Sequence, residues 1–250
     1  MPSQVKGNLK EFVVRFEELI ESFYKKHEQP RWSSDNFRQG PCLHFHRASI
    51  ECVRRESRPF SEWLPKDHYA HEMFYAMLTA WGMNQGGAKL RDFLDFKRAV
   101  SFLASLEALE KCRSIRLEDL THAKQPLLER LFEALDDPDQ AKVMASGPSV
   151  IGGSKLLHHL LPDLIPPMDR EYTEGSLNWF DDENKLEGAL DSFNGIWHVL
   201  MFFRKVALEV GSERIRKQWL DDTKYPMNTS IPKIIDNALI AYSWTLWPNG

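Results

Sequence analysis

Residues 145–170 read ASGPSVIGGSKLLHHLLPDLIPPMDR, and the interpretation of the whole chain starts from this stretch. Its first half contains the residues typical of a tight, exposed hairpin: Gly147, Pro148, Gly152 and Gly153. Residues 154–161 then predict a short helix, which Pro162 ends. Prolines at 166–167 favour an extended backbone that leads up to Asp169. The segment therefore predicts a hairpin, a short helix and a carboxylate placed just beyond a proline-containing loop.

Glycines placed directly before a helix leave its first amides without partners. These N–H groups and the positive end of the helix dipole attract an anion such as a backbone phosphate. We therefore expect the amides of Gly152, Gly153 and Ser154 to form a binding site for an anion such as a phosphate. Lys155 falls in the same first turn, where a cation is disfavoured, which points to a partner anion or to chemistry. The same residues also fit an ordinary helical hairpin with glycine-rich turns.

Outside this segment the chain predicts helices. Apolar residues recur at spacings of three and four, typical of amphipathic helices. These helices are expected at 8–24, 67–81, 90–109 with a break near Lys97, 126–135, 190–211, 212–220 and 230–242. Period-two alternation occurs only in LHFHR at 43–47, which equally fits a turn of helix. The fold class is predicted to be all-α.

The domain prediction is a single two-lobed helical domain over 1–250. The N- and C-terminal helices would form one lobe and residues of about 85–150 the other. A helix-hairpin-helix-like element at 138–161 is expected at the cleft, followed by an acidic loop at 171–191. No internal repeat is visible, which argues against a solenoid.

Composition sets wider limits on the class of protein. The chain has 250 residues, 42% apolar and 27% charged, so it can build a core without disulfides and is not disordered. Its three cysteines, an odd number without CxxC spacing, favour reduced thiols. No signal peptide is recognisable, and the longest apolar stretch, 197–203, is too short for a membrane span. We expect a cytoplasmic protein.

The net charge of −4 does not by itself favour a nucleic-acid partner. Residues 171–191, however, carry seven acids and one base, so the other 229 residues carry a net charge of +2. A basic face on the rest of the molecule is compatible with this distribution.

The order of hairpin glycines, lysine, short helix and aspartate resembles the core of the helix-hairpin-helix DNA glycosylase superfamily. The run SKLLHHLLPDLIPPMD is also similar to bacterial proteins grouped beside those enzymes. The resemblance covers about 25 of the 250 residues. Two positions depart from the family pattern, since Ile151 replaces the first hairpin glycine and Leu157 replaces a small residue. The interval of 14 residues from Lys155 to Asp169 is also shorter than usual.

The resemblance implies roles for particular residues. Gly153 matches the second hairpin glycine, Lys155 the lysine that some members use as a nucleophile, and Asp169 the catalytic aspartate. Double-stranded DNA is the implied partner, with no cofactor. The amides of Gly152, Gly153 and Ser154, together with Arg170, would grip its phosphates. Of the two candidate catalytic residues, we favour Asp169 over Lys155. Of the two possible reactions, we favour release of the base over cleavage of the DNA strand. The alternative for Asp169 is a helix N-cap.

A flipped base would need a pocket, for which we select Trp81, His158 and Tyr172. Trp81 is equally explained as a core residue. Lys233 and Asp236, one turn apart, predict a solvated ion pair, and the alternative is a role in the cleft.

Other clusters indicate no metal. His44, His46, His68, His71 and Glu72 lie in one region of the chain without forming an HExxH motif. Two glycine- or base-rich segments, at 82–88 and 213–219, are additional candidates for contact with a phosphate backbone.

Two other functions remain open at this stage. One is a non-catalytic nucleic-acid-binding protein that has the hairpin but no pocket, as the residues at 151 and 157 would allow. The other is a helical protein that binds a protein partner and no nucleic acid.

Overall fold

The computed structural model describes residues 9–26, 40–85, 87–146, 149–175 and 189–246. The described chain is all-α, as predicted, apart from one two-stranded ribbon. The longer helices are α1 (Leu9–Val14), α2 (Phe16–Lys26), α4 (Pro41–Arg55), α6 (His68–Ala80), α7 (Phe93–Ser105), α8 (Glu107–Cys112), α9 (Gln125–Asp136), α10 (Ser149–Leu160), α12 (Phe193–Val210), α13 (Ser212–Trp219) and α14 (Ile231–Leu246). Short helical turns are α5 (Phe60–Trp63), η1 (Leu64–Lys66), η2 (Leu117–Asp119), η3 (His122–Lys124), η4 (Arg170–Glu174) and η5 (Ala189–Asp191).

Several helix ends follow directly from the local sequence. The Asp67 side chain caps α6 by accepting a hydrogen bond from the Ala70 N–H at 3.0 Å. Pro126 occupies the first turn of α9, where its missing N–H costs no hydrogen bond. Gly211 ends α12 with φ of +94°, a conformation that other residues rarely adopt. The Ser230 hydroxyl accepts from the Lys233 N–H at the start of α14.

Other boundaries differ from the sequence prediction. The helix expected over 90–109 breaks at Leu106, which is extended, and not near Lys97. Residues 43–47 lie inside α4, so the alternation there belongs to a helix. The ribbon pairs β1 (Lys89–Leu90) antiparallel with β2 (Met144–Ser146). Strands of two and three residues are too short to produce an alternating pattern in the sequence.

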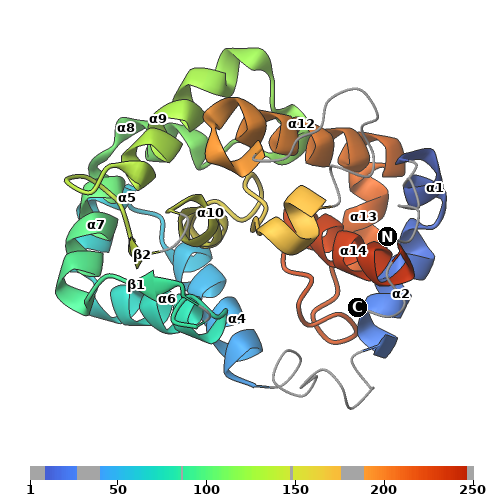
Figure 1. The fold of residues 1–250 in the computed structure, drawn as a ribbon, viewed down its shortest axis with the longest axis horizontal. Coiled ribbons are helices and arrows are strands. Elements are labelled where there is room, and N and C mark those ends of the chain that lie inside the picture. The colour runs from blue at the N-terminus through green and yellow to red at the C-terminus, as the bar shows by residue number, and fades with distance from the viewer. Residues whose placement is uncertain (1–8, 27–39, 86, 147–148, 176–188, 247–250) are drawn as a thin grey trace.

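The chain is arranged around α10, which lies in the middle of the molecule (Figure 1). The elements from α4 to β2 lie on one side of it, and the terminal helices α1, α2, α13 and α14 lie on the other. Helix α2 packs along α14, so segments from the two ends of the chain are neighbours. Phe12 meets Tyr242 and Phe16 meets Trp219 in edge-to-face ring contacts at 5.4 and 5.3 Å. One continuous apolar core joins the two sides.

The predicted hairpin at 152–153 is wrong. Helix α10 begins at Ser149 rather than Ser154, so both glycines lie inside the helix and are buried. Their small size serves close packing, because a Cβ on Gly152 would lie 2.4 Å from Met144 Sδ, and one on Gly153 would lie 2.8 Å from Leu135 Cδ1. The glycines therefore let α10 approach β2 and α9 closely, and they do not form a turn.

In the part of the chain that the structure describes, no helix has the length and apolar character to cross a membrane. Most of the acidic stretch expected at 171–191 lies outside the described residues.

Candidate functional site

Lys155 and Asp169 are brought together by one hydrogen-bonded connection. Ser154 Oγ donates to the Ile151 carbonyl within α10 at 3.1 Å and accepts from the Met168 N–H at 3.2 Å. This bond holds the backbone before η4 against α10. As a result, Asp169 interacts electrostatically with the amine of Lys155.

Asp169 is the N-cap of η4, so the capping interpretation is confirmed. Its Oδ1 accepts from the Tyr172 N–H at 2.7 Å, and its own N–H donates to Thr173 Oγ1 at 3.1 Å. These bonds fix the direction of the carboxylate. A carboxylate held in this way is preorganised for any charge that develops beside it.

Lys233 and Asp236 complete the site from α14. They were expected to form a solvated pair, but they are only 2% and 3% exposed, and Lys233 Nζ lies 2.6 Å from Asp236 Oδ2. The prediction was wrong because α14 is buried on every side from Ile231 to Ser243. The signal was available in the sequence, since a helix with apolar residues all round its axis belongs in the core.

Lys155, Asp169, Lys233 and Asp236 form what we call the charged cluster. Burial lowers the pKa of the Lys155 amine, Asp169 and Asp236 oppose that shift, and Lys233 adds to it. Burial raises the pKa of the Asp236 carboxyl, and the ammonium of Lys233 opposes this. Burial therefore shifts the Lys155 amine towards its neutral form, and the two carboxylates limit that shift.

A second group, the histidine cluster, consists of His46, His158 and His159 and lies against Trp81. The His46 ring stacks on Trp81 with centroids 5.1 Å apart, and it stacks nearly parallel to His158 at 5.7 Å. Burial lowers the pKa of all three imidazoles, to about 3 for His159. Sequence reasoning did not select His46 or His159 for the site, because a helical period shows which residues share a face but not which helices meet.

The hydrogen bonds of the histidine cluster define its tautomers. The Lys155 carbonyl can only accept, so the Nδ1–H of His159 donates to it at 2.7 Å and His159 Nε2 is an acceptor. His46 Nδ1–H therefore donates to His159 Nε2 at 2.8 Å, and Thr229 Oγ1 donates to His46 Nε2 at 2.8 Å. Burial disfavours a positive charge on each ring of this chain.

Two of the three residues predicted to line a base pocket lie beside the charged cluster. Trp81 is half-buried, and Lys233 Nζ lies 5.2 Å from the centroid of its ring. His158 is fully buried. Its Nδ1–H donates to the Ile165 carbonyl at 2.7 Å, while its Nε2 has no hydrogen-bond partner among the described residues. Tyr172 is partly buried and packs on the core.

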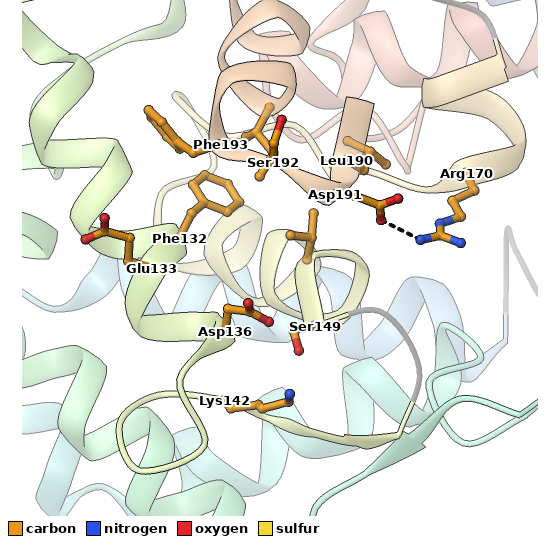
Figure 2. A pocket seen from close by; sticks show the side chains of 12 residues that line it. Phe132, Glu133, Asp136, Lys142, Ser149, Arg170, Leu190, Asp191, Ser192 and Phe193 are labelled. Atoms are coloured by element: carbon orange, nitrogen blue, oxygen red, sulfur yellow. Dashed lines mark hydrogen bonds and ion pairs between the residues drawn. The ribbon is translucent and has the colours of Figure 1, made fainter. Parts of the chain in front are cut away.

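Arg170 lies apart from these groups, in a pocket of about 450 Å³ between α9, the start of α10 and η5 (Figure 2). Its guanidinium forms an ion pair with Asp191 at 2.6 Å. Phe132 and Phe193 line the apolar end of this pocket, and Ser149 and Lys142 line another part. Neither Lys155 nor Asp169 lines it.

The predicted DNA contact through the amides of Gly152, Gly153 and Ser154 is not supported by their positions. The amides left open at a helix start belong to its first turn, which here begins at Ser149. Gly152 ends that turn, Gly153 and Ser154 come after it, and all three residues are buried, so they present no open surface to a phosphate. Ser154 instead contributes through its hydroxyl.

The histidines considered for a metal do not converge. His44 is exposed while His46 is buried on the other side of α4. His68 Nδ1 contacts Lys97 Nζ at 2.6 Å, and His71 Nδ1–H donates to the Asp67 carbonyl at 2.8 Å. Among the described residues, no group of three or more histidine, cysteine, aspartate or glutamate side chains is arranged to hold a metal ion.

The cysteines are not placed for nucleophilic chemistry. Cys42, Cys52 and Cys112 are free thiols. Burial raises the pKa of Cys52 and of Cys112 to about 11, so both are protonated at neutral pH. Lys155 is therefore the candidate nucleophile of the site.

Comparison of the chain with protein-family models, curated proteins and solved structures gives no match. The resemblance to DNA glycosylases therefore depends on residues 145–170 alone. The function has to be argued from the charged cluster and its surroundings.

Proposed function

We propose that the protein is a DNA glycosylase-like enzyme that binds duplex DNA and removes a modified or damaged base. Asp169 is its essential carboxylate, with the amine of Lys155 beside it. The observation that carries the proposal is the meeting of these two groups, fixed by the hydrogen bond from the Met168 N–H to Ser154 Oγ. A lysine and an aspartate from separate segments share one partly buried site.

The chemistry requires a carboxylate of this kind. When the C1′–N bond of a nucleoside breaks, its electron pair leaves with the base, which takes up a proton, and positive charge develops on the sugar. A carboxylate held in a site poor in water stabilises that charge more in the transition state than in the ground state. Water then supplies the hydroxyl group at C1′. Asp169 meets the requirement because its Oδ1 is fixed by the Tyr172 N–H.

Lys155 gives the site a second way to release the base. A neutral amine can attack C1′ in place of water, forming a covalent bond to the sugar while the base leaves. The lowered pKa of Lys155 supports this role. Base release by water remains the main reaction that we propose.

The first test is an assay on duplexes that each contain one modified base, with alkali-labile sites as the product. We expect at least one duplex to be cleaved and Asp169→Asn to reduce the rate about 100-fold or more. Asp163→Asn is the matched control, because Asp163 lies on the same connection, is exposed, and pairs only weakly with Arg54 at 3.5 Å. No product from any duplex, or full activity in Asp169→Asn, would contradict the enzymatic proposal.

A second candidate is a helical protein that binds no nucleic acid. It is favoured by the burial of Gly152 and Gly153 and by the ion pair that occupies Arg170. Binding of DNA and RNA at about 50 mM salt separates the candidates, because phosphate contacts are strong there. Flat binding curves favour this second candidate. Salt-dependent binding without any product favours a non-catalytic nucleic-acid-binding protein.

A further inference from the structure

The amine of Lys155 lies near two carboxylates, yet each of them is engaged by another group. Asp169 Oδ1 accepts from the Tyr172 N–H at 2.7 Å, and Asp236 Oδ2 accepts from Lys233 Nζ at 2.6 Å. Lys155 Nζ itself makes no ion pair or hydrogen bond with any residue that the structure describes. A second lysine thus occupies the carboxylate that Lys155 would otherwise use.

We infer that Lys233 is a positioning residue that binds Asp236 and so prevents Asp236 from forming an ion pair with Lys155. Lys233 is almost completely buried, so it does not itself reach a substrate or solvent. Its ammonium is held between Asp236 and the ring of Trp81. The Lys233–Asp236 pair adds little to the stability of the fold, because desolvation offsets most of the attraction in a buried ion pair.

The charged groups that act on Lys155 come from two neighbouring parts of the chain. The connection before η4 contributes Asp169, and α14 contributes Lys233 and Asp236. Helix α4 contributes Arg54, which acts on the histidine cluster and donates to the Thr229 carbonyl. The imidazoles of His46, His158 and His159 carry no negative charge in either protonation state, so they offer Lys155 no counter-ion.

The ammonium of Lys233 affects the protonation of Lys155. With Lys233 charged and bound to Asp236, burial dominates at Lys155 and its pKa is lowered. Without the ammonium of Lys233, Asp236 has Lys155 as the remaining cation of the charged cluster. The amine would then become a paired ammonium and would lose its lone pair for reaction.

This inference deepens the proposed function, since a neutral amine is what the covalent route requires, but its test needs no DNA. The full-length protein is labelled with ¹³C at lysine Cε, and the Cε–Hε signals are titrated with pH. Lys155→Gln assigns the signal of Lys155. We expect its midpoint in the wild type to lie below those of the exposed lysines.

The decisive variants change only α14. We expect Lys233→Met to raise the Lys155 midpoint by about one pH unit or more, and Lys233→Arg to leave it low, because arginine still binds Asp236. The double variant Lys233→Met with Asp236→Asn should return the midpoint below that of exposed lysines. An unchanged midpoint in Lys233→Met overturns the inference, and so does an equal rise in the double variant.

A further variant keeps the test decisive if Lys233→Met does not fold. In Asp236→Asn the carboxylate is lost while Lys233 stays charged, so the Lys155 midpoint should fall below that of the wild type. No change, or a rise, contradicts the inference. Its failure is also distinct from failure of the proposed function, because glycosylase activity and its loss in Asp169→Asn are measured separately.

Discussion

At the scale of single residues, Gly153 shows how one missing side chain sets the geometry of the site. Its backbone lies so close to α9 that a Cβ would meet Leu135 Cδ1 at 2.8 Å and Leu135 Cβ at 3.3 Å. Two positions later the same helix carries Lys155. The distance between α9 and α10 therefore helps to determine where the amine lies.

Gly153→Ala tests this packing. Alanine gains about 1 kcal/mol in helix propensity, but we expect overpacking against Leu135 to cost roughly 1–3 kcal/mol, with a net loss of stability. Gly152→Ala is the matched control, because its Cβ meets Met144 Sδ and Cγ, the movable part of a flexible side chain. Urea unfolding should give Gly153→Ala the lower free energy of unfolding. If Gly152→Ala instead has the lower free energy of unfolding, α9 moves aside for an added Cβ more easily than Met144 does.

At the scale of elements, the contact between α10 and the connection before η4 depends on Ser154. The Met168 N–H is buried, and Ser154 Oγ is its partner. Ser154→Ala should therefore destabilise the protein by about 1–3 kcal/mol through an unsatisfied N–H. Unfolding midpoints in urea measure this effect.

Ser243→Ala provides the comparison for Ser154→Ala. Ser243 is equally buried, but its hydroxyl donates to the Ile240 carbonyl within its own helix, so its loss should cost less. If the two variants lose the same stability, the role assigned to Ser154 is contradicted.

The histidine cluster connects α4 and α10 and predicts a pH dependence of stability. The folded-state pKa values of His46, His158 and His159 lie below the ordinary value of 6.5, so the unfolded chain binds more protons than the folded one in this range. Stability is fully present above pH 6.5 and declines as the pH falls towards the folded-state pKa values. Each histidine contributes up to about 1.4 kcal/mol per pH unit.

Urea unfolding at pH 7.5 and pH 5 measures this decline. His46→Gln should reduce the slope with pH because one titrating group is removed. His44→Gln, on the exposed side of the same helix, should leave the slope as in the wild type. Equal slopes in the wild type and His46→Gln would contradict a neutral, buried His46.

At the scale of the whole molecule, the packing of α2 on α14 joins the two ends of the described chain. Phe16 is buried against Trp219, whereas Val14 is 76% exposed nearby. We expect Phe16→Ala to cost about 3–5 kcal/mol and Val14→Ala about 0.5 kcal/mol or less. Calorimetry should show a single transition in both variants. A separate early transition in Phe16→Ala would mean that the terminal helices unfold independently.

The parts of the fold that depend on neighbouring residues were predictable, and those that depend on distant residues were not. The Asp67 cap and the Gly211 stop are local, and the sequence predicted the corresponding helix ends at 67 and 211. The start of α10 was misplaced because its glycines face Met144 and Leu135, which sequence spacing does not reveal. The sequence predicted Lys155 and Asp169 as partners only through a resemblance. The apolar sequence around Lys233 indicates a buried helix, but its place beside Lys155 depends on tertiary packing.

The position of Lys233 on α14 also bears on biosynthesis. A ribosome completes α10 and the Asp169 segment before the α14 segment emerges, so a partly synthesised chain holds Lys155 without Lys233 or Asp236. By our inference, its amine acquires the altered acidity only when α14 docks. Reactivity at Lys155 would thus report that the chain has finished folding.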